Sequence, residues 1–282
     1  MKKMILASLA FALTAAAQPA AQGYLDVYVA RVKPDKRAQF DAVAKKVATA
    51  NRQHKGDNWI TYQVEYGEQN TVYFVSPRVN YSAMDDAQKA FMGALKGAYG
   101  VAGMEKLLAD NDSYLISSRS EIRTRRPDLS SNLPADNAAL NNIVGKSRFF
   151  RIVSVRTRPG RGLDYEAELR KIKEASERQT PGRVTSVSQS SVGQALGVYY
   201  LTNFGDSIAA LASPKSLPEL LGERGYRDFS KNSADTTLGV DIIIGRLLPE
   251  LSNPPADMAS ADPAFWNPKP PPPAKPKAEE KK

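Results

Sequence analysis

The chain contains no cysteine and only one histidine, His54. Without a thiol it forms no disulfide, offers no thiolate metal ligand and has no cysteine nucleophile. A metal site built from several histidines of a single chain is excluded in the same way. Cysteine chemistry and multi-histidine metal chemistry within one chain are therefore excluded for this protein.

The chain also has little excess charge outside its two ends. The formal net charge is +9 over 282 residues, but Lys2, Lys3 and the segment 269–282 account for five of these charges. The remainder is too small to predict a nucleic-acid partner. Arg123, Arg125 and Arg126 have no aromatic residues between them and are predicted to be a solvated strand end.

The first residues have the pattern of a secretory signal. Lys2 and Lys3 precede an apolar run from Met4 to Ala17, which ends in small residues. This pattern predicts a signal peptide over residues 1–22, cleaved after Ala17 or Ala21. The run is too short for a comfortable membrane span, so we expect no transmembrane segment in the mature protein. The predicted location is periplasmic or secreted.

Two further segments lack the composition of a core. Residues 133–146 are polar and alanine-rich, and a linker is predicted there. Residues 254–282 are rich in proline and lysine, which predicts a disordered or extended tail. The tail is either simply solvated or contacts the cell envelope. Phe265 and Trp266, just before its most proline-rich part, are candidates to dock on the body.

The remaining chain repeats one order of elements. Within 23–132, apolar periodicity predicts strands at 24–33, 59–66, 72–76 and 113–125. It also predicts a helix over 35–54. A capping box at Ser82 predicts the start of a second helix, which is interrupted near 97–103. Within 147–253, strands are predicted at 149–158, 184–191, 198–203 and 238–248, with one helix after Pro159 and another from a capping box at Ser216. Both halves read β-α-β-β-α-β, the order of a ferredoxin-like unit.

Short sequence matches support an internal duplication. Arg31-Val-Lys-Pro34 is matched 125 residues later by Arg156-Thr-Arg-Pro159. Val72-Tyr-Phe-Val75 is matched 126 residues later by Val198-Tyr-Tyr-Leu201. Self-similarity at a long, nearly constant period indicates a repeated structural unit. Since side chains alternate along a strand, we expect Tyr73 and Tyr199 to face the same way in their two copies.

Such a duplication resembles the dimeric α/β-barrel superfamily, here as a tandem arrangement within one chain. The predicted fold class is α+β, with two tandem ferredoxin-like units packed through their sheets as a pseudo-dimeric α/β barrel. The superfamily includes monooxygenase-like, stress-responsive and haem-handling proteins. The resemblance implies a ligand held in or beside the barrel, in a pseudo-twofold monomer or a higher oligomer.

Polar residues on the predicted strands are the candidate ligand-binding groups. A wet, partly aromatic pocket results if they point into the barrel. Glu65 or Glu121 then serves as a base if burial raises its pKa, and an arginine holds an anionic ligand. Alternatively, they are ordinary solvent-facing or ion-paired residues. The candidates are Tyr28, Gln63, Glu65, Tyr73, Arg119, Glu121, Arg151, Tyr199 and Asp241.

A haem site is not predicted, and no other cofactor is. Haem-binding members of this superfamily such as chlorite dismutase use a histidine in their second unit, whereas the second unit here has none. His54 lies near the end of the first predicted helix, where a capping or packing role is simpler.

Three functions remain open on the sequence. The leading hypothesis is binding of a small aromatic or anionic molecule between or beside the sheets. The alternatives are a cofactor-independent monooxygenase-like enzyme and a non-catalytic cell-envelope interaction protein, and the sequence leaves open whether the protein is an enzyme.

Overall fold

The computed structural model describes residues 22–267. The segment 1–21, which holds most of the predicted signal peptide, and residues 268–282 of the predicted tail lie outside this range. Among the described helices, none has both the length and the apolar character needed to cross a membrane.

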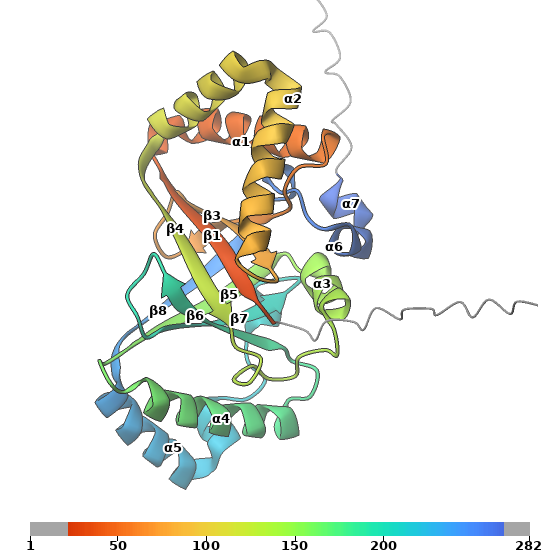
Figure 1. The fold of residues 1–282 in the computed structure, drawn as a ribbon. Coiled ribbons are helices and arrows are strands. Elements are labelled where there is room, and N and C mark those ends of the chain that lie inside the picture. Colours follow the sequence, from red (N-terminus) through yellow and green to blue (C-terminus); the bar gives the residue numbers. More distant parts are fainter. Residues whose placement is uncertain (1–21, 268–282) are drawn as a thin grey trace, which may run out of the picture.

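Eight antiparallel strands form one closed barrel in the centre of the molecule (Figure 1). Their order around the barrel is β1-β3-β2-β8-β5-β7-β6-β4, and β4 closes the ring by pairing with β1. Closure leaves no unpaired sheet edge. The strands are β1 (Tyr24–Val32), β2 (Ile60–Tyr66), β3 (Thr71–Arg78), β4 (Leu115–Arg125), β5 (Phe149–Thr157), β6 (Thr185–Val192), β7 (Val198–Gly205) and β8 (Thr237–Leu247).

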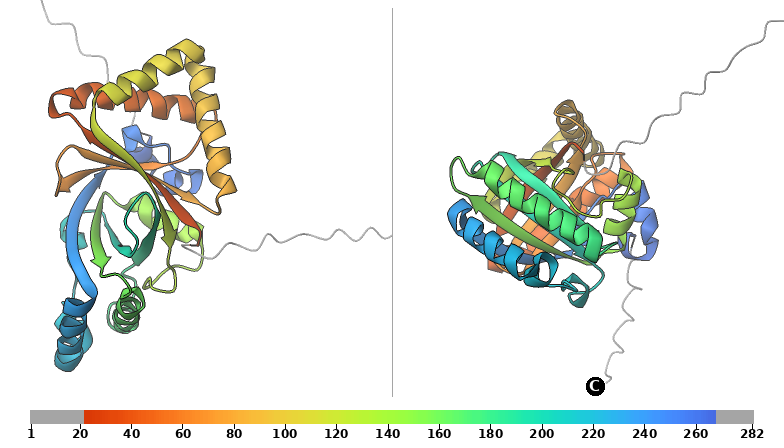
Figure 2. Two further views of the ribbon diagram at one scale, coloured as in Figure 1. Left: turned by 60° about the vertical axis from the view of Figure 1, so that its left-hand side comes forward. Right: turned by 90° about the horizontal axis from the view of Figure 1, so that it is seen from below.

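Helices cover two opposite sides of the barrel (Figures 1 and 2). The pair α1 (Arg37–Gln53) and α2 (Ser82–Ser113) lies over the strands of the first half, and α4 (Gly162–Gln179) and α5 (Leu217–Thr236) lie over those of the second. Three short helices pack beside the barrel between these layers: α3 (Asn137–Lys146), α6 (Ala256–Ala261) and α7 (Pro263–Trp266).

The two halves have the same strand order. Neighbouring strands run β4-β1-β3-β2 in the first half and β8-β5-β7-β6 in the second, each with the element order β-α-β-β-α-β. The β2–β8 and β4–β6 ladders join the halves. The predicted strand and helix positions within 24–125 and 149–248 therefore correspond to observed elements to within a few residues.

The expected equivalence of Tyr73 and Tyr199 is wrong by one residue. On β3, Tyr73 pairs with Val29 of β1, and the corresponding pair in the second half joins Tyr200 to Ser154. Tyr73 and Tyr200 belong to the cluster inside the barrel, whereas Tyr199 packs under α4. Because strand side chains alternate, a slip of one residue moves a side chain to the other face.

Both long helices of the two halves kink at a glycine. Gly100 in α2 and Gly222 in α5 have φ of 67° and 70°, in the left-handed region that favours glycine. The first kink lies within the predicted interruption. The capping box at Ser216 is confirmed, with Glu219 as its partner. The one at Ser82 is not, because the side chain of Asn80 accepts the hydrogen bond from the Ala83 amide instead.

Segments predicted as linker and tail contain ordered helices. Asp136 caps α3 by accepting a hydrogen bond from the Ala139 amide, which starts a helix inside 133–146. Trp266 of α7 is fully buried and donates from Nε1 to the carbonyl of Gly145, at 2.8 Å. The predicted docking of Trp266 is thus observed. These segments are ordered because their few apolar side chains meet the barrel and one another.

Candidate functional site

A buried ion cluster lies inside the barrel around Glu121 of β4. Its carboxylate accepts from Arg119 Nε at 2.6 Å and from Arg123 Nε at 2.8 Å, and its side chain has no exposed area. The Arg123 guanidinium lies 3.6 Å from the centre of the Tyr200 ring. Burial acts to raise the pKa of Glu121, but the charge of Arg123 and the hydrogen bond from Arg119 outweigh it, and the net pKa is lowered.

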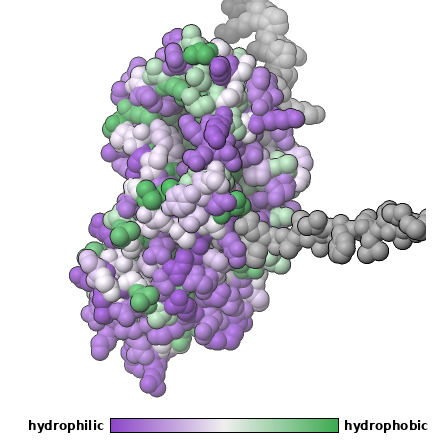
Figure 3. Space-filling view, in the orientation of Figure 1, coloured by the Kyte–Doolittle hydropathy of each residue, from purple (hydrophilic) through white to green (hydrophobic). Residues whose placement is uncertain are grey.

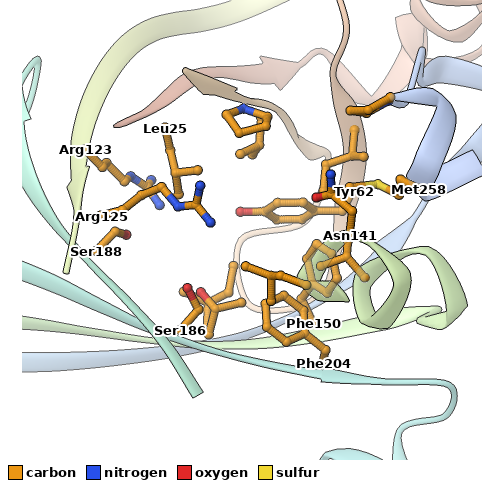
Figure 4. A pocket seen from close by; sticks show the side chains of 18 residues that line it. Leu25, Tyr62, Arg123, Arg125, Asn141, Phe150, Ser186, Ser188, Phe204 and Met258 are labelled. Atoms are coloured by element: carbon orange, nitrogen blue, oxygen red, sulfur yellow. The ribbon is translucent and has the colours of Figure 1, made fainter. Parts of the chain in front are cut away.

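Next to this cluster the barrel contains a half-open cavity of about 100 Å³, to whose lining α3 and α6 also contribute (Figure 4). Tyr62 of β2 points across it, stacked on Tyr73 at a ring distance of 4.7 Å. Arg125 of β4 reaches in from the opposite side. The walls combine hydroxyl and aliphatic groups with the aromatic residues Phe150 and Phe204.

Arg125 is a charged group without a carboxylate partner in the described chain. Its Nη1 donates to the Gln22 carbonyl at 3.1 Å and to Asn137 Oδ1 at 3.4 Å. Burial lowers the pKa of this guanidinium to about 10. An arginine remains protonated at neutral pH even so, and the cavity therefore contains a cation balanced only by neutral groups.

A larger cleft of about 730 Å³ separates the sheet of the second half from α4 and α5, and it is called the second cleft below. Half of its lining residues are aliphatic, and Phe229 from α5 and Tyr165 from α4 add aromatic surface. Its three charged lining residues are Arg151, Arg183 and Lys215, all positive. The cleft is thus apolar with a positive end, a composition suited to an organic anion.

Arg183 and Arg151 of this cleft differ in their hydrogen-bond partners. Arg183 donates to the carbonyls of Ala210, Leu211 and Ala212. Burial and the nearby charge of Arg151 lower the pKa of Arg183. Arg151 is half-buried, and within residues 22–267 it has no hydrogen bond or ion pair. Arg151 is therefore the cation of the cleft that is available to bind an anion.

A cleft at the corresponding place in the first half, called the first cleft below, has the opposite charge. It measures about 370 Å³ between the sheet and α1 and α2, and Asp26 of β1 occupies the position that Arg151 occupies on β5. Arg78 in this cleft donates to Asp57 at 2.8 and 2.5 Å and lies 3.5 Å from Asp26. Burial raises the pKa of Asp26. The two clefts are therefore specialised differently.

The nine predicted site residues do not form one site in the structure. Tyr73, Arg119 and Glu121 meet inside the barrel. Arg151 lies in the second cleft and Tyr28 in the first. Tyr199 is buried under α4, where its hydroxyl donates to Glu166 at 2.9 Å. Gln63 and Glu65 join an ion-paired network with Arg37 and Arg246, and Asp241 is exposed on β8.

Neither carboxylate considered as a base has the raised pKa that this role requires. Hydrogen bonds from Gln63 and Arg246 lower the pKa of Glu65. The pKa of Glu121 is lowered by its two arginines, as described above. Both groups are therefore ion-pair partners that stay ionised at neutral pH.

The second cleft does not offer a haem ligand among its described residues. His54 caps α1 in the first half, where it is exposed and lies beside Gly97 of α2. Tyr165 is the remaining candidate by side-chain type. Burial raises the pKa of Tyr165, which disfavours the tyrosinate that would bind iron. The donor set of the cleft thus does not fit haem.

Sequence reasoning missed Tyr62, Arg125 and Arg183. Arg125 and Arg123 were expected to be solvated, but β4 pairs with β6 of the other half, and Arg123 is buried and Arg125 half-buried. No local pattern shows that a strand end is covered by a partner more than sixty residues away in the chain. Alternation from Glu121 to Arg125 was the one available signal, since it puts these side chains on one face.

The outer surface presents a contrast to these cavities. On the face shown in Figure 3, hydrophobic residues occur singly or in small groups, and the region of α4 and α5 is largely hydrophilic. Scattered apolar residues of this kind are normal for a protein surface. The candidate sites are therefore the internal cavities rather than this face.

Comparison with known proteins shows the fold and no specific family. No family model and no curated protein matches the chain. Among solved structures, an anthrone oxidase-like protein has a TM-score of 0.50 at 11% identity, covering 80% of this chain and 91% of that one. A protein from Fusobacterium nucleatum subsp. nucleatum, provisionally named a monooxygenase, has a TM-score of 0.49 at 12% identity, with 80% and 92% covered. Chlorite dismutase from Candidatus Nitrospira defluvii has a TM-score of 0.45 at 10% identity, with 80% and 91% covered. The likeness to the anthrone oxidase-like protein shows that the two chains share an α+β barrel fold.

Proposed function

We propose that the second cleft binds an organic acid with an apolar or aromatic body. The observation that carries this proposal is Arg151, a half-buried cation without a partner in the described chain, at the end of a largely apolar cleft of about 730 Å³. A carboxylate or sulfonate on Arg151 forms charge-assisted hydrogen bonds and reduces its repulsion with Arg183. The apolar body gains about 25 cal/mol for each Å² that it removes from water.

The proposal is tested with an aromatic sulfonate whose fluorescence rises in apolar surroundings, 1-anilinonaphthalene-8-sulfonate. We expect Arg151→Met to weaken its binding by about tenfold or more, the loss of one charge-assisted interaction. Arg156→Met is the matched control, because Arg156 is on the same strand, exposed and on the opposite face. Decanoate is expected to displace the probe, and decanol of equal chain length is expected to be weaker.

Equal affinity of the wild type and the Arg151→Met variant would contradict the proposal, as would equal competition by decanoate and decanol. Arg156→Met guards against a general effect of removing a positive charge. Circular dichroism of each variant checks that the fold is retained, since Arg151 makes no hydrogen bond that its loss would break.

A second candidate is a cofactor-independent, monooxygenase-like oxidation in the same cleft. In support, solved structures of this fold include proteins named for monooxygenase and anthrone oxidase chemistry, although fold alone carries no activity. A cation such as Arg151 favours the ionised form of a bound phenol or enol. The electron-rich anion then reacts with dioxygen, and an activated CH₂ becomes C=O while the second oxygen atom leaves as water.

Oxygen consumption with an anthrone as substrate tests this candidate. Turnover that is lost in Arg151→Met and kept in Arg156→Met supports it. Binding of the sulfonate probe without any oxygen uptake leaves the protein as a binding protein.

The repeated strand order supports a further proposal, that the chain is a tandem pair of ferredoxin-like units within 23–132 and 147–253. The opposite charges of Asp26 and Arg151 then record divergence of the two copies. Export through a signal peptide at residues 1–22 remains a proposal from the sequence. N-terminal sequencing of the mature protein, recovered from a periplasmic fraction, tests it.

A further inference from the structure

We infer that the cavity inside the barrel is a second anion site, built around Arg125 for a short carboxylate. This site is separate from the cleft of the proposed function: it lies on the inner side of the strands, whereas that cleft lies between the strands and the helices of the second half. Its ligand is small, because the cavity measures about 100 Å³.

The space arises from a difference between the two halves. Tyr62 of β2 pairs with Tyr73, and the corresponding pair in the second half joins Ser188 to Tyr200. Serine thus replaces tyrosine at the equivalent inward position. Ser186 likewise stands where β2 has Ile60. The smaller side chains leave a gap opposite Tyr62, whose edges carry hydroxyl groups (Figure 4).

The groups around this gap are hydrogen-bond donors: the Arg125 guanidinium, which has two neutral acceptors, and two hydroxyl groups that have none. Arg125 pairs with Ser188 across the β4–β6 ladder, so both side chains lie on the same face. Tyr62 is 2% exposed, and its hydroxyl has no hydrogen bond among residues 22–267. Ser188 is 4% exposed and also lacks a side-chain hydrogen bond within that range. An oxyanion in the gap would accept hydrogen bonds from both hydroxyl groups and a charge-assisted one from Arg125.

The acidic side chain on the same strand already binds two other arginines. Glu121, two positions before Arg123 on β4, is bound by Arg119 and Arg123. It is therefore unable to serve as the counter-ion of Arg125 without leaving the buried Arg123 unpaired. An anion from outside is the remaining way to neutralise Arg125.

The wall opposite Arg125 selects the body of the ligand. Phe150, Phe204 and Met258 present apolar surface there (Figure 4), and Val144 of α3 also lines the cavity. An engineered cavity of about 150 Å³ holds benzene, so about 100 Å³ suits a carboxylate with a chain of two to four carbons. Propionate and butyrate match this size and chemistry.

Thermal unfolding of the full chain with added propionate tests the site. A ligand that binds only the folded state raises the melting temperature with its concentration. We expect this rise in the wild type and in Arg156→Met, and we expect propionamide, which is neutral and of equal size, to produce none. Arg125→Met is expected to weaken propionate binding by about tenfold or more, from loss of a charge-assisted interaction.

A second variant separates binding from folding. Tyr62→Phe keeps the stacked ring and removes only the hydroxyl, so its fold should persist even if Arg125→Met unfolds, and its propionate affinity should fall by about threefold or more. The inference is overturned if propionate and propionamide act alike on the wild type, or if Tyr62→Phe and Arg125→Met both bind propionate as the wild type does. Binding of the sulfonate probe in the second cleft is expected to be unchanged in both variants, which keeps the two sites distinguishable.

Discussion

Glu121 illustrates how a single buried charge depends on its partners. Its carboxylate has no exposed area and neutralises Arg119 and Arg123 inside the barrel. Such a pair is weak evidence of net stability, because both charges lose their hydration. Removing one partner is nevertheless costly, since the other charge stays buried and unpaired.

We expect Glu121→Gln to lower the free energy of unfolding by about 3 kcal/mol, measured by urea denaturation. Glu65→Gln is the matched control. Glu65 is also bound to an arginine, Arg246, but their side chains are 30% and 49% exposed. Its loss is expected to cost less than about 1 kcal/mol. Equal costs for the two variants would show that burial of the Glu121 pair is unimportant.

The lowered pKa of Glu121 also predicts a pH dependence. A carboxylate whose folded-state pKa is depressed contributes stability above its unfolded pKa of about 4.3, and this stability is lost as pH falls through the folded-state pKa. The unfolding free energies of wild type and Glu121→Gln should therefore converge on acidification below about pH 4. A constant difference across that range would contradict the assignment.

At the scale of elements, the kinks of α2 and α5 depend on backbone conformation. Gly100 and Gly222 have positive φ, and an alanine at either position would be strained although no atom crowds it. We expect Gly100→Ala and Gly222→Ala each to reduce the unfolding free energy by about 1 kcal/mol. Gly93→Ala is the control, because Gly93 is helical and equally uncrowded. It should increase stability by about 0.5–1 kcal/mol, measured in the same urea titrations.

The strands show why elements alone do not place side chains. Arg151 and Arg156 are both arginines on β5, yet one enters the second cleft and the other is exposed on the opposite face. Alternation predicts that they differ, since they are five residues apart. Alternation does not show which face of the strand packs against helices and which face points into the barrel.

At the scale of the whole molecule, a segment after the last strand packs against the barrel (Figure 1). Trp266 is fully buried against the cluster inside the barrel, together with Met258 of α6. We expect Trp266→Ala to lower the unfolding free energy by about 3–5 kcal/mol, the usual range for a large buried aromatic residue. Trp59, the other tryptophan, remains as the fluorescent reporter of unfolding.

A truncation serves as the control for this prediction. Removal of residues 268–282 takes away a segment without large apolar side chains, and its loss is expected to leave the melting temperature within about one degree of wild type. Removal of residues 256–282 takes away α6 and α7 as well and should destabilise at least as strongly as Trp266→Ala. Equal stability of the two truncated chains would contradict the role of α6 and α7.

The sequence by itself determined the positions of most strands and helices and their repeated order. These follow from apolar periodicity and turn residues, which act over a few neighbouring positions. Glycines near 97–103 and the box at Ser216 are local signals of the same kind. The predicted linker was less well specified, because whether α3 is ordered depends on its contacts with α6 and Trp266.

Only the tertiary structure decided what the polar strand residues do. Arg123 is buried and Arg125 half-buried because β4 pairs with β6, and Glu65 pairs with Arg246 near the surface because β2 pairs with β8. Tyr73 and Tyr199 face opposite ways because of a one-residue difference in register. Burial and partners of a charge are set by segments distant in the chain, and a local pattern contains no information on them.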